Sequence, residues 1–330
     1  MTVSRRRFLQ LGALAGAAFL VPSCLASFAT SGSSAHRKLV LLQLTGGNDG
    51  LNTVVPYSND IYYKSRPTIA VARNAVLTLT DDAGFHPGLR RLANLYHSGW
   101  VSIINNVGYA GAHRSHHKCL STWHTASTCK QSSGWLERHF NQHQGNNAPN
   151  CFSQYNTPEN LPASHIANAS SGISLREKLR KVATMINEQE DQQAFFVAHG
   201  GYDTHVHQVA DHSSRLAELD AALHTMVQDL RKADQFQHTM ILVYSEFGRR
   251  VSENQWAGTD HGTANSVFII SGGLSQAGLY NPVPDLSDLE DGDLMHSVDF
   301  RQVYATILDG WLYGNSEAVL GAQYARLGFV

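Results

Sequence analysis

The stretch KLVLLQL at residues 38–44 is continuously apolar and runs directly into the glycine-rich turn GGNDG at residues 46–50. A short apolar run that ends at a turn is typical of a strand buried on both faces of a parallel sheet. The same pattern of an apolar run followed by a polar segment recurs along the chain. It predicts further strands over residues 100–107, 192–198, 238–244 and 267–271.

Segments with helical periodicity alternate with these strands. Amphipathic helices are expected over residues 86–97 and 209–234, and a closing helix over residues 299–312. This alternation predicts an α/β fold with a doubly wound, mostly parallel sheet and helices on both faces. We expect one domain over residues 38–330, in which residues 134–178 form loops and short helices.

Charge and composition narrow the classes of function. The net charge is −2, so no basic field points to nucleic acid as a partner. The chain has 18 histidines, many of them grouped near aspartates, which favours metal binding or acid–base chemistry. The alternative is that most of these histidines are solvated residues of polar loops.

Polar motifs follow three of the predicted strands. GGNDG at residues 46–50, HGGYD at residues 199–203 and SEFGR at residues 245–249 each come directly after an apolar run. Because ligands of doubly wound sheets bind at the carboxyl ends of the strands, we expect these motifs to meet at one edge.

Asp203 and His207 are candidate metal ligands. They are four residues apart, so on the first turn of a helix they would share a face and could bind one divalent ion. The alternative is that Asp203 caps the following helix while the histidines are solvated.

Three further residues could complete this ligand set. His261 lies in a glycine-flanked loop and offers an imidazole, and Glu246 and Asp49 offer carboxylate oxygens at strand ends. For Asp49 the alternative is a type I′ turn. A set of imidazoles and carboxylates suits zinc or manganese better than calcium, which prefers oxygen alone.

Ser115, Arg114 and Arg249 are candidate catalytic residues. Ser115 opens a predicted helix, where free N–H groups stabilise anions, and it could act as a nucleophile. Arg114 and Arg249 could hold a planar oxyanion through paired hydrogen bonds. The alternatives are a serine helix cap and an ordinary surface ion pair.

The N-terminus has the features of a twin-arginine signal peptide. SRRRFLQ at residues 4–10 opens an apolar run that is too short to span a bilayer as a helix, which needs ~20 residues. We therefore expect a signal over residues 1–29 and a linker over residues 30–37. The twin-arginine translocase would be a partner during export to the periplasm or the outside, and no transmembrane span is expected after cleavage.

The cysteines leave two questions open. Cleavage is expected after Ala26 or Ala29, although a lipid anchor at Cys24 is a possible alternative. In the mature chain, a local disulfide between Cys119 and Cys129 is one possible pairing, and it would leave Cys151 unpaired.

Taken in order, the motifs LLQLTGGNDGLNTVVPY, HRSHHKCLSTW, GGYDTHVHQ, LVYSEFGRRVSEN and GTDHGTANSVFIISGG resemble one family. It is the family of bacterial exported proteins known as domain of unknown function 1501. The resemblance covers residues 38–312, and this family is itself similar to the alkaline phosphatase and sulfatase superfamily. The resemblance implies an alkaline-phosphatase-like fold with one or two divalent metals at the carboxyl edge of the sheet.

The resemblance also implies roles for single residues. Asp49 would correspond to the first aspartate of the superfamily, Ser115 to its nucleophile, Asp203 and His207 to its Asp-x-x-x-His pair, and His261 to its later histidine. The chain departs from the pattern at Glu246-Phe247, where the superfamily has Asp-His. This departure favours a single-metal site built from Asp203, His207 and His261, with Asp49 and Glu246 nearby. His116 or His205 could supply a replacement ligand.

The function implied is that of an exported, metal-dependent hydrolase of phosphate or sulfate esters. Its substrate would be an anionic small molecule or polymer, and zinc or manganese would be favoured over calcium as the metal. The alternative is a non-catalytic metal-binding or structural protein of the cell envelope on the same fold. A third class is polysaccharide binding by aromatic residues around the site.

Overall fold

The apolar run at residues 38–44 forms the inner strand β1 (Lys38–Thr45) in the computed structural model. The structure describes residues 36–128, 133–144, 173–189 and 191–330, all of which lie in the unit His36–Val330. The signal peptide, the cleavage sites and Cys24 lie outside the described residues, as do Cys129 and Cys151. Within the part described, no helix is long and apolar enough to cross a membrane.

The sheet around β1 is mixed and mostly parallel, as predicted. Its order is β12-β5-β8-β7-β1-β6, with β9 paired to β5. Only β8 runs antiparallel to its neighbours β5 and β7 among the pairs described for this sheet. The strands other than β1 are β5 (Val101–Gly108), β6 (Ala194–Gly200), β7 (Thr239–Tyr244), β8 (Asn265–Ile270), β9 (Gly278–Leu279) and β12 (Val298–Asp299).

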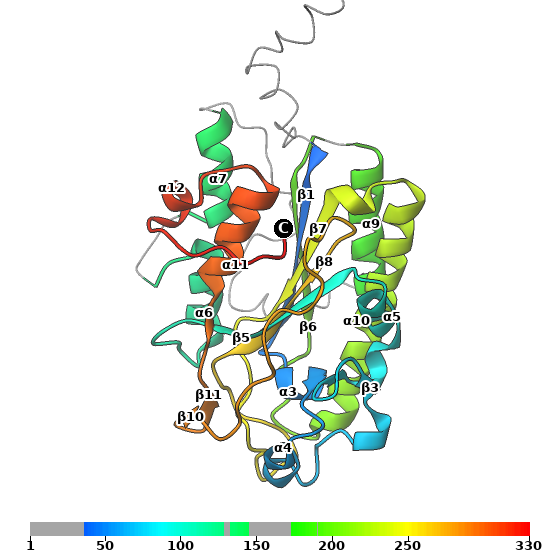
Figure 1. The fold of residues 1–330 in the computed structure, drawn as a ribbon, viewed down its shortest axis with the longest axis vertical. Helices are drawn as coiled ribbons and strands as arrows, with labels where there is room; N and C mark the ends of the chain where they lie inside the picture. The colour runs from blue at the N-terminus through cyan, green and yellow to red at the C-terminus, as the bar shows by residue number, and fades with distance from the viewer. Residues whose placement is uncertain (1–35, 129–132, 145–172, 190) are drawn as a thin grey trace, which may run out of the picture. The chain divides into compact units, whose positions relative to one another are not determined.

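Helices cover both faces of this sheet (Figure 1). One face carries α5 (Arg90–His97), α9 (Leu175–Asn187) and α10 (Gln208–Lys232). The other face carries α6 (His116–Thr125), α7 (Trp135–Gln144), α11 (Phe300–Thr306) and α12 (Ser316–Leu320).

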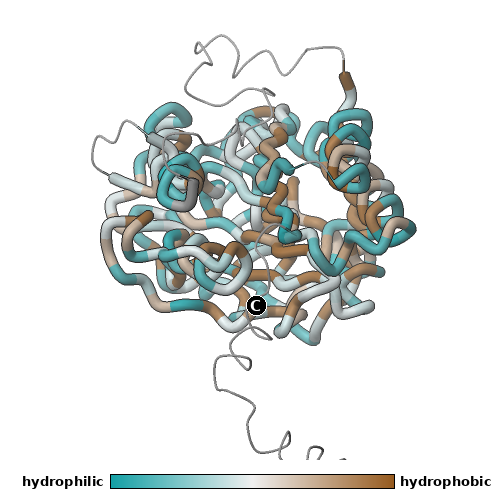
Figure 2. The backbone as a smooth tube through the Cα atoms, turned by 90° about the horizontal axis from the view of Figure 1, so that it is seen from above, coloured by the Kyte–Doolittle hydropathy of each residue, from teal (hydrophilic) through white to brown (hydrophobic). Residues whose placement is uncertain are grey.

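Alternate residues of β1 enter the two cores that these helices enclose. Val40, Leu42 and Leu44 belong to the core under α5, α9 and α10, whereas Leu39 and Leu41 belong to the core under α6, α7 and α11. The backbone coloured by hydropathy shows the apolar segments in the interior and hydrophilic segments on the outer turns (Figure 2). Successive side chains of a strand point to opposite faces, so a strand buried on both sides must be apolar throughout.

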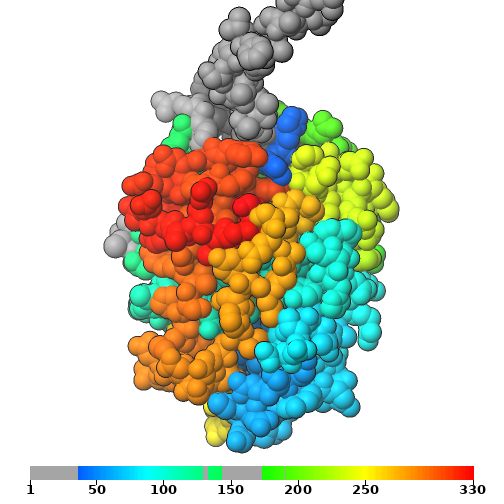
Figure 3. Space-filling model, viewed as in Figure 1, coloured from blue at the N-terminus to red at the C-terminus, as the bar shows by residue number. Residues whose placement is uncertain are grey.

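Short elements gather at the carboxyl end of β1. Leu51, Val55, Tyr62, Leu286 and Leu294 from these elements form a third apolar cluster. The segments around residues 55 and 285 lie side by side at this end in the space-filling view (Figure 3). The elements are α3 (Gly50–Thr53), β2 (Val54–Val55), α4 (Asp60–Ser65), β3 (Leu77–Thr78), β4 (Gly84–Phe85), β10 (Leu289–Glu290) and β11 (Asp293–Leu294).

The predicted helices form with small differences at their ends. The expected helix over residues 86–97 begins as the 3-10 turn η3 (Pro87–Leu89) before α5. The closing helix is capped by Asp299 and passes from α11 into the π-helical turn η7 (Ile307–Trp311). Two further 3-10 turns are η2 (Arg73–Ala75) and η6 (Phe236–His238).

Cys119 is a buried free thiol, and Cys129, its partner in the expected disulfide, lies outside the described residues. Its Sγ donates to the carbonyl oxygen of His113 at 2.8 Å and lies 3.4 Å from the hydroxyl of Tyr109. The thiol therefore belongs to the packing at the start of α6.

Two buried imidazoles make the stability of the fold sensitive to acid. Burial lowers the pKa of His86 and of His212 to about 4 from the usual 6.5. A histidine with a lowered pKa is neutral in the fold, so its contribution is complete above pH 6.5 and is lost as the pH falls towards 4. Each pKa unit corresponds to about 1.4 kcal/mol.

We therefore expect the unfolding free energy measured in denaturant to fall steeply between pH 6.5 and pH 4.5. In His212→Gln this pH dependence should be weaker, because one of the two buried imidazoles is gone. A stability that is constant over this interval would contradict the neutral state of these two side chains.

Candidate metal centre

Four chain segments meet at the carboxyl edge of the sheet, as the sequence predicts. Asp203 comes from the loop after β6, Glu246 from the loop after β7, and His261 from the loop that leads into β8. His116 is the first residue of α6, which follows β5. A β-bridge between Arg249 and His261 joins the β7 and β8 loops.

The carboxylate of Asp203 is the centre of a cluster of three imidazoles. Its Oδ1 lies 3.0 Å from Nε2 of His205 and 3.0 Å from Nε2 of His261, and these two nitrogens are 2.9 Å apart. Its Oδ2 lies 3.5 Å from Nε2 of His116. We call these four residues the Asp203 cluster.

The outer nitrogen of each imidazole faces a hydrogen-bond acceptor. Nδ1 of His116 lies 2.8 Å from Oε1 of Glu246, and Nδ1 of His261 lies 2.8 Å from the carbonyl oxygen of Arg114. Nδ1 of His205 lies 3.4 Å from Oδ1 of Asp260. An acceptor at Nδ1 requires the proton there, so each neutral ring presents an unprotonated Nε2 to the cluster.

The Nε2 atoms of three imidazoles therefore converge on the Asp203 carboxylate, and the guanidinium of Arg249 also contacts Oδ1 of Asp203 at 2.7 Å. Burial acts to lower the pKa of His116, but hydrogen bonds to Asp203 and Glu246 outweigh it and raise that pKa to about 9. Burial acts to raise the pKa of Asp203, but hydrogen bonds from His116, His261 and Arg249 hold it well below its usual range.

The donor set fits a divalent cation. Donor atoms of His116, Asp203 and His261 all lie within 4.8 Å of one another, and His205 adds a third nitrogen. Tetrahedral ligands at bond lengths of ~2.0–2.1 Å are separated by about 3.3 Å, which is close to the spacing found here. The side chain of Asp203 is 48% exposed, so a cation in the cluster would be open to an external ligand.

Phe247 packs under the cluster. Its ring centroid lies 4.9 Å from that of His116 and 4.6 Å from that of His261, and the ring is buried. A Cβ on Gly47 would lie 2.2 Å from the Phe247 ring, and Gly47 has φ +72°, so glycine is required there. Phe247 thus supports two imidazoles and offers no ligand atom of its own.

Glu246 holds His116 and lies outside the ring of Nε2 atoms. Its side chain is buried, Oε1 accepts from the backbone N–H of Gly46 at 2.8 Å, and Oε2 accepts from the hydroxyl of Ser245 at 3.2 Å. The remaining bond to Nδ1 of His116 fixes the orientation of that imidazole. Such a carboxylate–imidazole pair is common behind metal-binding histidines.

Arg249 is a buried brace. Its guanidinium donates to the carbonyl oxygens of Gly47 and Thr259 at 2.7 Å each, and to Oδ1 of Asp203 at 2.7 Å. Further bonds reach the carbonyls of Gly46 and Tyr202. These hydrogen bonds hold three loops against the cluster. They also occupy the guanidinium that we expected to bind an anion.

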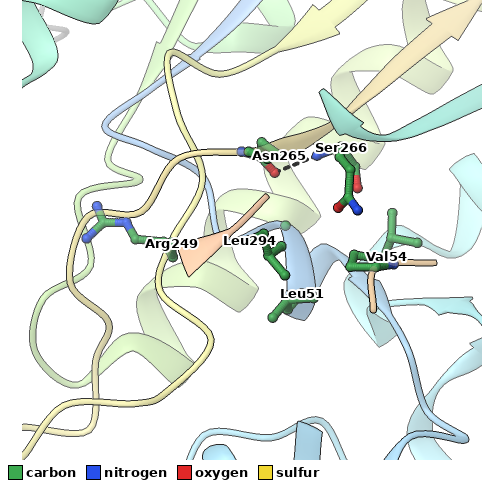
Figure 4. A pocket seen from close by; sticks show the side chains of 10 residues that line it. Leu51, Val54, Arg249, Asn265, Ser266 and Leu294 are labelled. Atoms are coloured by element: carbon green, nitrogen blue, oxygen red, sulfur yellow. Dashed lines mark hydrogen bonds between the residues drawn. The ribbon is translucent and has the colours of Figure 1, made fainter. Parts of the chain in front are cut away.

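Arg249, Asn265 and Ser266 also border a small cavity between α3, β8 and β11 (Figure 4). The close-up shows the Arg249 side chain extending away from Leu51 and Val54. Nδ2 of Asn265 donates to the carbonyl oxygens of Asn48 and Phe247, so the cavity wall is itself hydrogen-bonded to the loops of the site.

Asp49 lies behind the cluster, in a buried ion pair. Its Oδ2 is 2.6 Å from Nη1 of Arg66, and both side chains are fully buried. Oδ2 also accepts from Gln208, and Oδ1 caps α3 by accepting from the N–H of Asn52. Burial acts to raise the pKa of Asp49, but Arg66 holds it below its usual range. The structure therefore does not bring Asp49 together with Asp203.

His207 is exposed and lies outside the Asp203 cluster. Helix α10 begins at Gln208, and His207 has the left-handed φ of 47°. The expectation that Asp203 and His207 share a helical turn is thus wrong, because residues 201–207 are a loop. The alternative of Asp203 as the helix cap is also wrong, since the cap residue is His207.

Ser115 and Arg114 lie at the edge of the cluster. Ser115 is the exposed N-cap residue of α6 and makes no capping hydrogen bond with its side chain. Nε and Nη2 of Arg114 bond to the buried carboxylate of Asp293 at 2.8 and 2.5 Å, and the Arg114 side chain stays 41% exposed. The carbonyl oxygen of Arg114 faces His261, so residues 114–116 are fixed beside the imidazoles.

The sequence motifs lie on the loops that form the Asp203 cluster. His116 and His205, which the sequence offers as replacement ligands, are members of the cluster, whereas His207, which the motif spacing favours, is not. A local signal for His205 does not exist in the spacing, because its partner His261 is 56 residues away.

Comparison with known proteins gives one family match. Residues 180–314 match the model of the family described as protein of unknown function (DUF1501). No curated protein matches the chain.

Similar solved structures share little sequence with this chain. The lipoteichoic acid synthase LtaP from Listeria monocytogenes is 10% identical, with a TM-score of 0.46 over 90% of this chain and 75% of that one. The C-terminal periplasmic domain of EcEptC from Escherichia coli, in complex with Zn, is 11% identical, with a TM-score of 0.44 over 72% and 73%. A protein in the alkaline phosphatase superfamily from Vibrio parahaemolyticus is 11% identical, with a TM-score of 0.46 over 87% and 69%. Over residues 180–314, the chain is thus similar to the family described as protein of unknown function (DUF1501).

Proposed function

We propose that this protein is an exported, metal-dependent hydrolase of phosphate or sulfate esters. The observation that carries the proposal is the convergence of the Nε2 atoms of His116, His205 and His261 on the Asp203 carboxylate at a solvent-accessible edge. Zinc or manganese suits this set of nitrogen and oxygen donors better than calcium. Asp203, His205, His261 and His116 would hold the cation. When bound, it would supply positive charge that polarises the ester oxygen.

Ser115 is the nucleophile in this proposal. It lies at the N-terminus of α6, directly before His116, and its side chain is exposed. The free N–H groups of the first turn of α6 would stabilise the charge on the transferred group. Arg114, anchored by Asp293 but half-exposed, would orient the anionic group beside Ser115.

In this proposal the site holds a single cation. Asp49, which could have been a ligand of a second cation, is paired with Arg66. Phe247 stands in place of the imidazole that a second cation would need. Arg249 braces the loops and acts on the reaction through Asp203.

Export also belongs to the proposal. The SRRRFLQ motif at residues 4–10 would direct the chain through the twin-arginine translocase to the periplasm or beyond. That route carries folded proteins, so the cation could be loaded before export.

Ser115→Ala is expected to abolish ester hydrolysis while leaving the bound cation in place. Losing a nucleophile removes the covalent route, and a fall of at least ~10³-fold in kcat is expected. The measurements are the rate on a panel of phosphate and sulfate monoesters with added zinc or manganese, and the metal content of both proteins. Ser121→Ala, in the same helix, is the matched control and should retain activity.

Two outcomes would count against the proposal. Full activity in Ser115→Ala would exclude Ser115 as the nucleophile. A wild-type protein that binds one cation per chain but hydrolyses none of the esters would favour the non-catalytic, metal-binding role in the cell envelope.

A further inference from the structure

Three exposed apolar residues lie on two neighbouring segments next to the Asp203 cluster. Trp256 is 57% exposed, Val209 51% and Val206 49%. The N–H of His207 donates to the carbonyl oxygen of Trp256 at 3.0 Å, so the Trp256 loop lies against residues 206–209. Large apolar side chains exposed as a group are uncommon on soluble domains and often mark a binding site.

The loop that presents Trp256 is fixed in place by Asn254. Oδ1 of Asn254 accepts from the N–H groups of Trp256 at 3.0 Å and Gly258 at 3.1 Å, and its own N–H donates to the Gly258 carbonyl at 2.8 Å. A Cβ on Gly258 would lie 2.2 Å from the carbonyl carbon of His205, so the backbone of this loop packs directly against the backbone of His205. A ligand that binds here would therefore order little additional backbone.

The same asparagine connects this loop to the cluster. Nδ2 of Asn254 donates to the carbonyl oxygen of His205 at 2.9 Å and to Oδ1 of Asp260 at 3.2 Å. Asp260 in turn faces the outer nitrogen of His205. A group bound on Trp256 would thus lie beside a group bound at the Asp203 cluster.

We propose that Trp256, Val206 and Val209 form a platform for a neutral sugar ring, which would be the alcohol part of the ester substrate. This inference rests on the proposed function and names the substrate class of the same site. An indole face and two branched side chains suit the apolar face of a ring. The Asp260 carboxylate, 55% exposed at the edge of the platform, accepts hydrogen bonds from hydroxyl groups and repels a second anion. A bare alkyl chain would offer that carboxylate no donor beyond those of Asn254 and His205.

The test compares two anions that differ only in the sugar. The zinc-loaded protein is titrated calorimetrically with inorganic phosphate and with glucose 6-phosphate, and every protein compared, the one called wild type included, carries Ser115→Ala so that the ester is not hydrolysed during the titration. The wild type is expected to bind glucose 6-phosphate about tenfold more tightly than phosphate. In Trp256→Ala the two affinities should come within about twofold of each other, with the phosphate affinity and the zinc content unchanged.

Tyr313→Ala is the matched control. This side chain is also an exposed aromatic, at 41%, but it follows η7, where Nε1 of Trp311 bonds to the carbonyl of Lys38 at the opposite end of β1. The preference for glucose 6-phosphate should survive in Tyr313→Ala.

Each remaining outcome is decisive. Equal affinity of the wild type for both anions, or a preference that survives Trp256→Ala, would overturn the platform while leaving the cation and the hydrolase intact. Tighter binding of hexyl phosphate than of glucose 6-phosphate would assign the platform to an alkyl chain and contradict the assignment to a sugar ring. Failure to bind phosphate at all would instead contradict the proposed function, and this inference with it.

Discussion

His261→Ala is expected to remove the bound divalent cation and the thermal stabilisation that the cation provides. Nε2 of His261 lies 2.9 Å from Nε2 of His205 and 3.0 Å from Oδ1 of Asp203, so its loss opens the ligand set on one side. A cation present at about 100 times its Kd stabilises the fold by about 2.7 kcal/mol. The shift in Tm on adding zinc or manganese should therefore be a few degrees in the wild type and close to zero in the variant.

His207→Ala is the control for this experiment. His207 is exposed, lies outside the Asp203 cluster and follows the same loop. Its removal should leave both the metal content and the shift in Tm as they are in the wild type. Loss of the cation in His207→Ala, with retention in His261→Ala, would return the ligand assignment to the Asp-x-x-x-His spacing.

Asp49→Ala is expected to destabilise the protein by ~3–5 kcal/mol, because it leaves the buried Arg66 without a counter-charge. Both side chains are fully buried and 2.6 Å apart, and Asp49 also caps α3 and binds Gln208. The cation stoichiometry should stay at the wild-type value. Chemical denaturation gives the stability, and metal analysis of the folded fraction gives the stoichiometry.

Two variants separate a buried ion pair from a general loss of charge. Adding Arg66→Met to Asp49→Ala should restore part of the lost stability, since no unpaired charge then remains inside. Asp60→Ala breaks an exposed pair with Arg73 and should have no measurable effect. If Asp49→Ala lost the cation and kept its stability, Asp49 would be a ligand.

The sheet could be predicted from the sequence because burial on both faces demands apolar residues throughout a strand. The runs at residues 38–44 and 238–244 become β1 and β7 with ends shifted by one residue at most, and the predicted alternation with helices is confirmed. The small sheet at Val54–Phe85 and the hairpin at Leu289–Leu294 escaped prediction, since two-residue strands have no periodicity to read.

The loops that form the site could be predicted from the sequence more readily than the side chains that face into it. Strand ends converge for topological reasons, so placing the loops of Asp203, Glu246 and His261 together required only the strand pattern. Which atoms face inward depends on partners far along the chain, such as Arg66 for Asp49 and Glu246 for His116. The four-residue spacing of Asp203 and His207 brings two side chains together only in a helix. His207 has a left-handed backbone conformation, and the helix begins after it.

Anomalous diffraction from crystals of the protein grown with zinc or manganese would locate the bound cation directly. We expect one strong peak per chain, about 2.0–2.2 Å from Nε2 of His116, His205 and His261 and from the carboxylate of Asp203. We further expect Asp49 to remain paired with Arg66. A peak coordinated by Asp49 or by His207, or the absence of any peak at the Asp203 cluster in saturating metal, would contradict this assignment of the ligands.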